Sequence, residues 1–282
     1  MARIGFDGAL AHLKRDGALL KHCDDTVCER FTDIAAKKWE IHNHCNVVGA
    51  SKNGSGITLM MDNDATLQAD ALLVATGRIP NGDLLDAELA GVEVRDGSVV
   101  VDEYQRTTAR GIYALGDVSS DYQLKHVANH EMRVVKENLL LDWDDTSRLK
   151  QSDHRFVPSA VFTDPQIAMV GLTENQARAQ GYDVRSKVQD YGDVAYGWAM
   201  EDTTGIAKII VEADSGKILG AHIMGHQASS LIQPLIQAMT FGLAGQDMAR
   251  GQYWIHPALP ELIENALLAL CGEPPWPPAR RH

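Results

Sequence analysis

The apolar positions near the carboxyl end of the chain repeat at the spacing of a helix. The positions that share one face of this expected helix, residues 260–270, are Leu262, Ile263, Ala266, Leu267 and Leu270. This spacing predicts an amphipathic helix with one packed face. Pro260 suits its first turn, because the N–H that proline lacks has no partner inside the helix there.

A candidate acid–base pair lies at the start of this expected helix. Glu261 would stand at the positive end of the helix dipole, which favours a carboxylate, and His256 precedes it by five positions. We expect Glu261 to hydrogen-bond one ring nitrogen of His256. The other nitrogen would then be able to donate or accept a proton near neutral pH. The alternative is a solvated histidine followed by a glutamate that only caps the helix.

The amino-terminal half alternates between one helical pattern and several short strands. Residues 19–37 have the spacing of a helix, and strands are expected in three segments, residues 39–49, 56–61 and 66–69. Residues 71–75 are a short, fully apolar run typical of a buried parallel strand. This run leads to Gly77 and Arg78, where glycine lets the backbone pass close to a ligand.

A second strand-to-loop unit follows. Residues 107–115, with the apolar run 112–115 at their end, predict a strand that leads to Gly116 and Asp117. Open α/β sheets bind ligands at the carboxyl ends of their strands, and Asp117 can accept hydrogen bonds from ligand hydroxyl groups such as those of a ribityl chain. Residues 121–138 predict an approach loop and a helix, and the polar residues 142–152 are the best candidate for a linker.

The carboxyl-terminal half has the pattern of an α+β unit with an antiparallel sheet. Its expected strands are residues 160–162, 184–188, 207–211 and 218–223, and its expected helices are residues 173–180, 229–241 and 260–270. The apolar segment 231–241 is expected either to be buried or to pack on another subunit. The Pro-rich residues 273–282 are expected to be disordered.

Composition narrows the class of protein. The 282 residues are 45% hydrophobic and carry a formal net charge of -12, which argues against a surface for nucleic acid or an anionic membrane. No apolar run is long enough to span a bilayer and no secretory segment opens the chain, so a cytoplasmic protein is expected. Cys23 and Cys28 are separated by four residues on the helical pattern 19–37, and we interpret this spacing as incidental. No metal site is expected.

Four motifs in order resemble one known family. Residues 75–78, residues 111–117, residues 162–174 and the His256–Pro257…Glu261 segment are similar to motifs of the FAD-dependent pyridine nucleotide–disulfide oxidoreductases. The resemblance covers roughly residues 19 to 270. Within the family, residues 191–202 and 253–261 are most similar to a member that uses NADPH to reduce the disulfide of a small-molecule thiol.

The resemblance implies a fold that combines α/β and α+β parts. Residues 1–70 would be a remnant of the NAD(P)-binding domain, and residues 71–150 the carboxyl-terminal part of the FAD-binding domain. Residues 151–272 would be the family's dimerisation domain with its antiparallel sheet. The chain would then form a homodimer through residues 151–272.

The resemblance also implies roles for individual residues. Asp117, after Gly116, would contact the ribityl and pyrophosphate region of FAD, while Gly77 and Arg78 would lie beside NADPH. His256 would carry the proton at the active site of the other subunit, and Glu261 would orient it. A further segment would pass along the flavin ring: Gln123, Leu124, Lys125, His126 and Val127.

The sequence departs from the family in its redox and phosphate-binding motifs. It holds no Gly-x-Gly-x-x-Gly segment and no redox cysteine flanked by the family's Gly and Pro residues. We therefore expect a catalytically incompetent carboxyl-terminal portion of such an enzyme, explained by a truncated or misread gene start or by a frameshift. The alternatives are a non-catalytic dimerisation module, or an enzyme with dihydrolipoamide dehydrogenase or glutathione-reductase-like activity.

Overall fold

The computed structural model describes residues 11–13, 18–42, 44–54 and 56–271. Contacts divide the chain into two units, one made of residues up to 72 together with residues from 158 onward, the other of residues 73–157. The expected disordered tail, residues 273–282, lies outside the described residues. The division into three domains at residues 70 and 150 stays a prediction.

The first unit is built on a five-stranded antiparallel sheet with the order β10-β11-β12-β9-β8. Its strands are β8 (Ser159–Val161), β9 (Gln166–Gly171), β10 (Val184–Asp190), β11 (Ile206–Glu212) and β12 (Ile218–Gly225). The four strands expected from the pattern are confirmed, and each observed strand begins and ends within two residues of its expected bounds. The sequence reading did not identify β9 as a strand, although it pairs with both β8 and β12.

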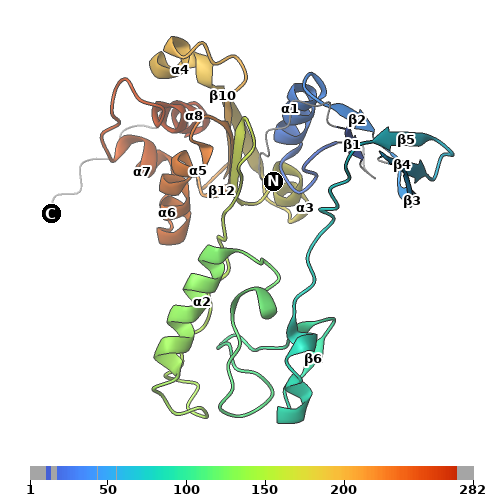
Figure 1. The fold of residues 1–282 in the computed structure, drawn as a ribbon. Coiled ribbons are helices and arrows are strands. Elements are labelled where there is room, and N and C mark those ends of the chain that lie inside the picture. The colour runs from blue at the N-terminus through green and yellow to red at the C-terminus, as the bar shows by residue number, and fades with distance from the viewer. Residues whose placement is uncertain (1–10, 14–17, 43, 55, 272–282) are drawn as a thin grey trace. The chain divides into compact units, whose positions relative to one another are not determined.

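Helices cover both faces of this sheet (Figure 1). On one side lie α5 (Ala228–Leu231), α6 (Gln233–Phe241), α7 (Gly245–Arg250) and α8 (Glu261–Cys271). On the other side lie α1 (Asp25–Ala36) and α3 (Glu174–Ala179), and the short α4 (Ala195–Ala199) follows β10. The five apolar positions expected on α8 are all buried, which confirms that pattern.

The apolar segment expected as one helix over residues 229–241 is divided between α5 and α6. Pro234 lies at the start of α6, where its missing N–H costs no helical hydrogen bond. Leu235 and Met239 are buried against the unit, whereas Phe241 at the end of α6 is largely exposed. The segment is therefore packed on its own unit along most of its length and leaves an apolar side chain in solvent at its end.

Helix α1 packs on the sheet rather than standing apart from it. Val27, Phe31 and Ala35 share one buried cluster with Ile206 on β11 and Met224 on β12. The helix expected from residue 19 begins only at Asp25, because Asp24 adopts an extended backbone and its side chain accepts the Thr26 N–H as an N-cap. The residues before it form turns.

A buried group of charges joins α1 to the sheet. Lys208 on β11 is 7% exposed and places its Nζ 2.7 Å from Asp24 Oδ1 and 2.9 Å from Glu174 Oε2. The Glu174 N–H donates to Asp24 Oδ2 at 3.0 Å. The cation thus lies between two carboxylates that are 150 positions apart in the chain, and it satisfies both.

The titration of these groups reflects the same contacts. Burial alone would raise the pKa of Glu174, but hydrogen bonds from Lys208, Arg178 and Ser186 outweigh it and lower the pKa to about 2. Burial opposes the charge of Asp24 in the same way, yet hydrogen bonds from Lys208 and from the Glu174 amide lower its pKa. For Lys208, burial works against the cation, whereas the hydrogen bonds to Asp24 and Glu174 raise its pKa. All three groups are therefore held in their charged forms.

Two smaller sheets complete the first unit. Strands β3 (Val47–Asn53), β4 (Gly56–Met61) and β5 (Thr66–Ala69) form an antiparallel meander, as the pattern predicts for residues 56–61 and 66–69. The strand expected over residues 39–49 is instead two elements, β2 (Glu40–His42), which pairs in parallel with β1 (Ala11–Leu13), and the start of β3.

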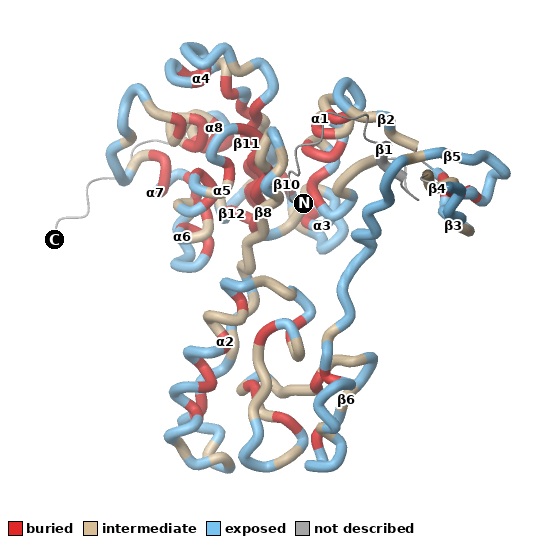
Figure 2. The backbone as a smooth tube through the Cα atoms, in the orientation of Figure 1, coloured by how far each residue is buried: buried red, intermediate tan, exposed pale blue. Residues whose placement is uncertain are grey.

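The apolar run 71–75 is not a buried strand, and this expectation was wrong. Residues 71–79 carry no strand and are exposed along their length (Figure 2), with Leu73 at 74% exposure. A parallel strand is buried only when neighbouring strands and covering helices supply partners on both sides. No described strand pairs with this run, so its apolar side chains stay in solvent.

The second unit is organised around α2 (Lys125–Asn138) and a short hairpin of β6 (Val94–Arg95) and β7 (Ser98–Val99). The strand expected over residues 107–115 is reduced to isolated bridges, Val101 to Thr107 and Arg106 to Tyr113. Among the described residues, the backbone of this segment hydrogen-bonds to loop residues rather than to a neighbouring strand. One example is the bond from the Thr107 N–H to the Ile112 carbonyl.

Residues 142–152, expected as a linker, are part of this second unit. Asn138 at the end of α2 is fully buried, and its side chain bonds both the N–H and the carbonyl of Lys150. The Ser152 N–H donates to the Glu103 carbonyl. On α2, Val127 and Val135 are buried, whereas Met132 and the following Leu139 are exposed.

The four cysteines lie in the described part of the chain as thiols. Cys23 is buried just before α1 and Cys28 is buried within it, where the Cys28 thiol donates to the Leu20 carbonyl at 2.9 Å. Burial, together with the nearby Cys28 and Asp24, raises the pKa of Cys23 to about 12, so this sulfur is held as the unreactive thiol.

The buried cation gives a first prediction. Lys208→Met should lower the free energy of unfolding by about 3 kcal/mol, because it leaves the buried carboxylate of Asp24 without its cation, while Glu174 keeps Arg178. Urea unfolding followed by tryptophan fluorescence measures this change. Lys217→Met, at an exposed lysine before β12, is the matched control and should change stability little.

A double variant sharpens this test. Adding Asp24→Asn to Lys208→Met removes the carboxylate charge that is left without a cation, so part of the lost stability should return. Equal stability of Lys208→Met and the wild type would show that the buried ion pairs do not hold α1 on the sheet.

Candidate functional site

His256 and Glu261 form the hydrogen-bonded pair expected from their spacing. His256 Nδ1 lies 2.8 Å from Glu261 Oε1, and the other carboxylate oxygen accepts the Ala258 N–H at 3.0 Å. The imidazole side chain is 69% exposed, whereas that of Glu261 is 17% exposed. The carboxylate is thus fixed by the first turn of α8 and its preceding loop, and it holds a ring whose remaining nitrogen is open to solvent.

The charge of Glu261 is stabilised by these contacts. Burial would raise the pKa of Glu261, but the hydrogen bonds from His256 and from the Ala258 amide lower it. The next carboxyl group on the helix behaves in the opposite way, because burial and the charge of Glu261 raise the pKa of Glu264. The carboxylate beside His256 is therefore the one that remains ionised as pH falls.

An open hollow adjoins the loop that carries His256. It has a volume of about 320 Å³, and its lining residues are Tyr196, Gln227, Ser230, Leu231, Pro234, Ala258, Leu259 and Pro260. Large apolar side chains near this loop in sequence are also exposed, with Tyr253 and Ile255 just before His256. An apolar surface around an exposed histidine is what an interface with another molecule would cover.

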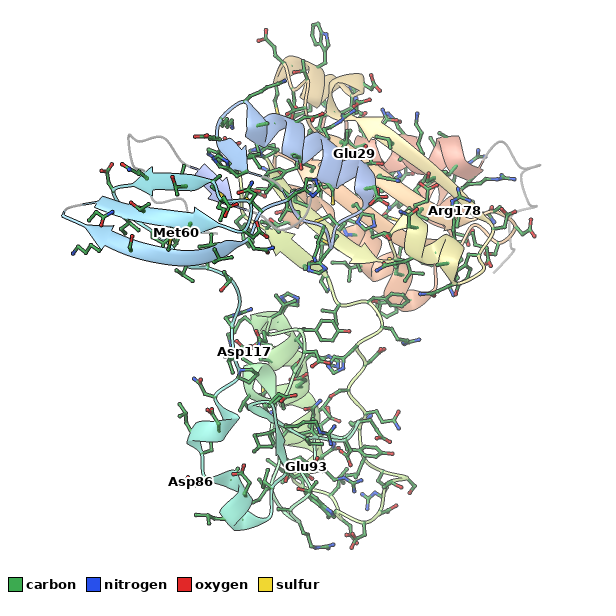
Figure 3. The ribbon with its side chains drawn as sticks, turned by 90° about the vertical axis from the view of Figure 1, so that its right-hand side faces the viewer. Glu29, Met60, Asp86, Glu93, Asp117 and Arg178 are labelled. Atoms are coloured by element: carbon green, nitrogen blue, oxygen red, sulfur yellow. The ribbon has the colours of Figure 1, made fainter. Side chains whose placement is uncertain are left out.

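In the second unit, the loop of Arg78 meets the turn of Asp117. Arg78 Nη1 lies 3.6 Å from Asp117 Oδ2, and Arg78 Nη2 donates to the Gln123 carbonyl at 3.0 Å. The sequence analysis assigned Arg78 to NADPH and Asp117 and Gln123 to FAD, whereas the described chain brings all three together. Gly77, which precedes Arg78, has a φ of +143°. Both charged side chains are more than half exposed, and Asp117 stands on the turn before α2 (Figure 3).

The turn itself depends on Gly116. Its φ of +71° is in the left-handed region, and a Cβ built there would lie 3.1 Å from the Ala128 Cβ of α2. The Gly116 carbonyl accepts the N–H groups of Ser119 and Ser120. Glycine is therefore required both by the backbone conformation and by the close packing of the turn on α2.

The segment 123–127 forms the entry to α2. Gln123 has a φ of +48°, Leu124 is the N-cap in an extended conformation, and Lys125 Nζ reaches Asn129 Oδ1 at 2.9 Å. His126 is exposed, whereas Val127 is buried in the unit. Lys125 and His126 therefore lie at the surface of the segment, while Val127 packs in the unit.

Two residues that the sequence analysis did not single out support this turn. Glu131, on α2, is 1% exposed; its Oε2 accepts the Gly116 N–H at 2.6 Å and its Oε1 lies 3.0 Å from His154 Nε2. The signal available in the sequence was a glutamate on the apolar face of an expected helix, four positions from Val127 and from Val135. No local pattern would have pointed to His154.

A polar hollow of about 250 Å³ lies next to this pair in the second unit, lined among others by Gln105, Ser119, Glu131 and His154. Gln105 is 3% exposed, and its Oε1 has no hydrogen-bond partner among the described residues.

The described residues bring no three His, Cys, Asp or Glu side chains together as a metal site. None of the described helices has the length and apolar character needed to cross a membrane.

The proposed site residues thus fall into two groups. His256 and Glu261 belong to the first unit, and the residues of the Arg78 loop, the Asp117 turn and the entry to α2 belong to the second. Within each group the structure brings the side chains or backbone groups into contact.

Comparisons with known proteins agree with these motifs. Residues 11–131 match the family model described as pyridine nucleotide-disulphide oxidoreductase, and residues 157–267 match the model of the dimerisation domain of the same proteins. The chain belongs to the pyridine nucleotide–disulphide oxidoreductase family.

Among its relatives, the chain is 70% identical to mycothione reductase of Mycobacterium tuberculosis over 256 residues, which are 91% of this chain and 56% of that protein. It is 33% identical to dihydrolipoyl dehydrogenase of Mycobacterium bovis, over 80% of this chain and 48% of the relative. The chain therefore spans about half the length of these curated relatives.

Solved structures show the same fold. The flavoprotein disulfide reductase RclA from Escherichia coli, described as HOCl-induced and solved as a Cu(II) complex, superimposes with a TM-score of 0.85 and 27% identity. That match covers 94% of this chain and 59% of the RclA chain. The combination of mixed helices with antiparallel sheets is thus the fold of flavoprotein disulfide reductases, as the resemblance implied.

The turn at Gly116 gives a second prediction. Gly116→Ala should lower the free energy of unfolding by about 3 kcal/mol, because it adds a contact with Ala128 to the cost of a left-handed backbone. Gly111→Ala is the matched control, since Gly111 also has a positive φ but has open space where its Cβ would lie. It should cost about 1 kcal/mol. Urea unfolding of both variants tests this, and equal losses would remove the role of the Ala128 contact.

Proposed function

We propose that the chain is part of a flavoprotein disulfide reductase that uses NADPH to reduce mycothiol disulfide to mycothiol. The observation that carries this proposal is the preformed pair of His256 and Glu261, with an exposed ring and a fixed carboxylate. The 70% identity to mycothione reductase of Mycobacterium tuberculosis supports the choice of substrate.

The pair suits the proton transfer that disulfide reduction requires. A thiolate attacks one sulfur of the substrate, the S–S bond breaks, and the departing thiolate needs a proton. The outward ring nitrogen of His256 supplies that proton, while Glu261 holds Nδ1 and stabilises the protonated ring. Because the ring is exposed on its own unit, it is available to an active site on a second copy of the chain.

Part of an FAD site fits the residues present. Asp117 offers carboxylate oxygens to ribityl hydroxyl groups, and the exposed guanidinium of Arg78 lies close to the same turn. When bound, FAD supplies the transfer of electrons from a reduced nicotinamide to a disulfide. The entry to α2, residues 123–127, offers backbone groups beside it. Gly77 and Arg78 are proposed to line the neighbouring NADPH site.

We propose that this chain alone does not complete the reaction. Its sequence holds neither a Gly-x-Gly-x-x-Gly segment for a dinucleotide pyrophosphate nor the family's redox cysteine pair. Cys23 and Cys28 are no substitute, because burial raises the pKa of Cys23 to about 12. Homodimerisation is proposed through residues 151–272, of which residues 157–267 match the dimerisation-domain model.

Two other functions are considered. The 33% identity to dihydrolipoyl dehydrogenase favours a lipoamide substrate over a glutathione-like disulfide, but it is less than half the identity to mycothione reductase. A non-catalytic dimerisation module is favoured by the exposed apolar side chains before His256. It would need no ordered His256–Glu261 pair, and the pair therefore favours the reductase.

Substrate choice is tested in a chimera. The part of the Mycobacterium tuberculosis relative that the match does not cover is joined to this chain, and NADPH oxidation is followed with mycothiol disulfide and with lipoamide. We expect kcat/KM for mycothiol disulfide to exceed that for lipoamide by about 100-fold, the size of discrimination that a few buried polar contacts provide. A preference for lipoamide would overturn the assignment.

The role of His256 is tested in the same chimera. His256→Gln should slow disulfide reduction by about 100-fold, because no other group in the pair can donate the proton. Flavin reduction by NADPH, measured by stopped-flow absorbance, should not change. His226→Gln, at another exposed histidine of the first unit, is the matched control. Equal loss of both half-reactions in His256→Gln would reject the role.

A further inference from the structure

Glu131 is a buried carboxyl group whose two oxygens bind two separate segments of the second unit. Its Oε2 accepts the backbone N–H of Gly116 at 2.6 Å, and its Oε1 lies 3.0 Å from Nε2 of His154. The side chain is 1% exposed. A carboxyl group is buried at little cost only when both oxygens are hydrogen-bonded, so these two contacts explain its position on the inner face of α2.

The contact with Gly116 fixes the turn from which Asp117 projects. The N–H of Gly116 is bound by Glu131, and its carbonyl is bound by the N–H groups of Ser119 and Ser120. The Cα of Gly116 packs directly on Ala128, one turn of α2 before Glu131. Hydrogen bonds therefore hold the turn on both sides of Gly116, and the Asp117 carboxylate extends from it into solvent.

His154 supports Glu131 from the other side. Its ring packs against Tyr122 at a centroid distance of 5.4 Å and against His130 at 6.4 Å. The Asp153 N–H, next in the chain, donates to His130 Nε2. These contacts restrict the orientation of the His154 ring, so that Nε2 faces Glu131 and the ring limits the rotamers open to the carboxyl group.

We propose that Glu131, supported by His154, is a positioning residue for the Gly116–Asp117 turn and thereby for the FAD that Asp117 contacts. The identity of that ligand rests on the proposed function, whereas the restraint on the turn does not. Glu131 acts through the backbone of Gly116 and does not itself touch the ligand. The Asp117 carboxylate meets the ribityl hydroxyl groups at a set angle only while the Gly116 N–H is held.

The test uses the full 282-residue chain and two readouts. Hydrogen exchange of the Gly116 amide, followed by NMR, reports the restraint, and titration with FAD, followed by flavin fluorescence, reports its effect on the ligand. Glu131→Gln removes the charge from the hydrogen bond with little change in shape. Its Gly116 amide should exchange about 10-fold faster, and its Kd for FAD should rise about 10-fold.

Glu137→Gln is the matched control, because Glu137 is an exposed carboxylate on the same helix. It should leave both readouts unchanged. His154→Phe keeps Glu131 but removes its second partner, so Gly116 should again exchange faster than in the wild type. If circular dichroism shows that Glu131→Gln does not fold, His154→Phe is the variant that tests the positioning role.

The outcomes separate this inference from the proposed function. Unchanged Gly116 exchange in Glu131→Gln, or in His154→Phe where the first variant is unfolded, would overturn the positioning role. Faster exchange with an unchanged Kd for FAD would also overturn it, since the turn would then not govern the ligand. If the wild-type chain binds no FAD while its Gly116 amide is protected through Glu131, the restraint stands and the flavin assignment in this chain fails.

Discussion

The buried ion pairs of Lys208 are the interaction on which the first unit depends. An ammonium group on β11 can be buried only if carboxylates meet it, and these come from Asp24 at the start of α1 and Glu174 at the start of α3. The same Asp24 caps α1 and accepts the backbone N–H of Glu174. One cation therefore places two helices against one face of the sheet, and α1 is bound to strands that follow it by more than 160 residues.

The opposite face of that sheet carries the helix on which the candidate proton carrier depends. Helix α8 buries Leu262, Ile263 and Leu267 in the unit, and this packing fixes the position of Glu261 in its first turn. Glu261 in turn holds His256, whose ring remains in solvent. A fixed carboxylate that holds an exposed imidazole is a suitable arrangement for a proton donor that serves another molecule. In the second unit a packed helix again positions a carboxylate. The packing of α2 fixes Glu131, and Glu131 hydrogen-bonds the Gly116 N–H in the turn that carries Asp117.

Two segments with the composition of strands have no strand partners among the described residues. The run at residues 71–75 has the composition of an inner strand, yet no described strand pairs with it. The expected strand at 107–115 likewise bonds to loops. The composition of a segment indicates whether it suits a buried strand, whereas strand pairing depends on which other strands lie next to it.

The sequence by itself determined the elements whose signal is local. The five buried positions of α8 follow from helical spacing, the strands β11 and β12 from short apolar runs, and the hydrogen bond between His256 and Glu261 from a separation of five residues. The tertiary structure alone decided the contacts between distant residues: Lys208 with Asp24, Arg78 with Asp117, and Glu131 with Gly116 and His154. Periodicity reports which face of an element is apolar, but it carries no information about which distant polar group will satisfy a buried charge. That choice is made when the elements pack, because each buried charge must then find its partner or remain unsatisfied.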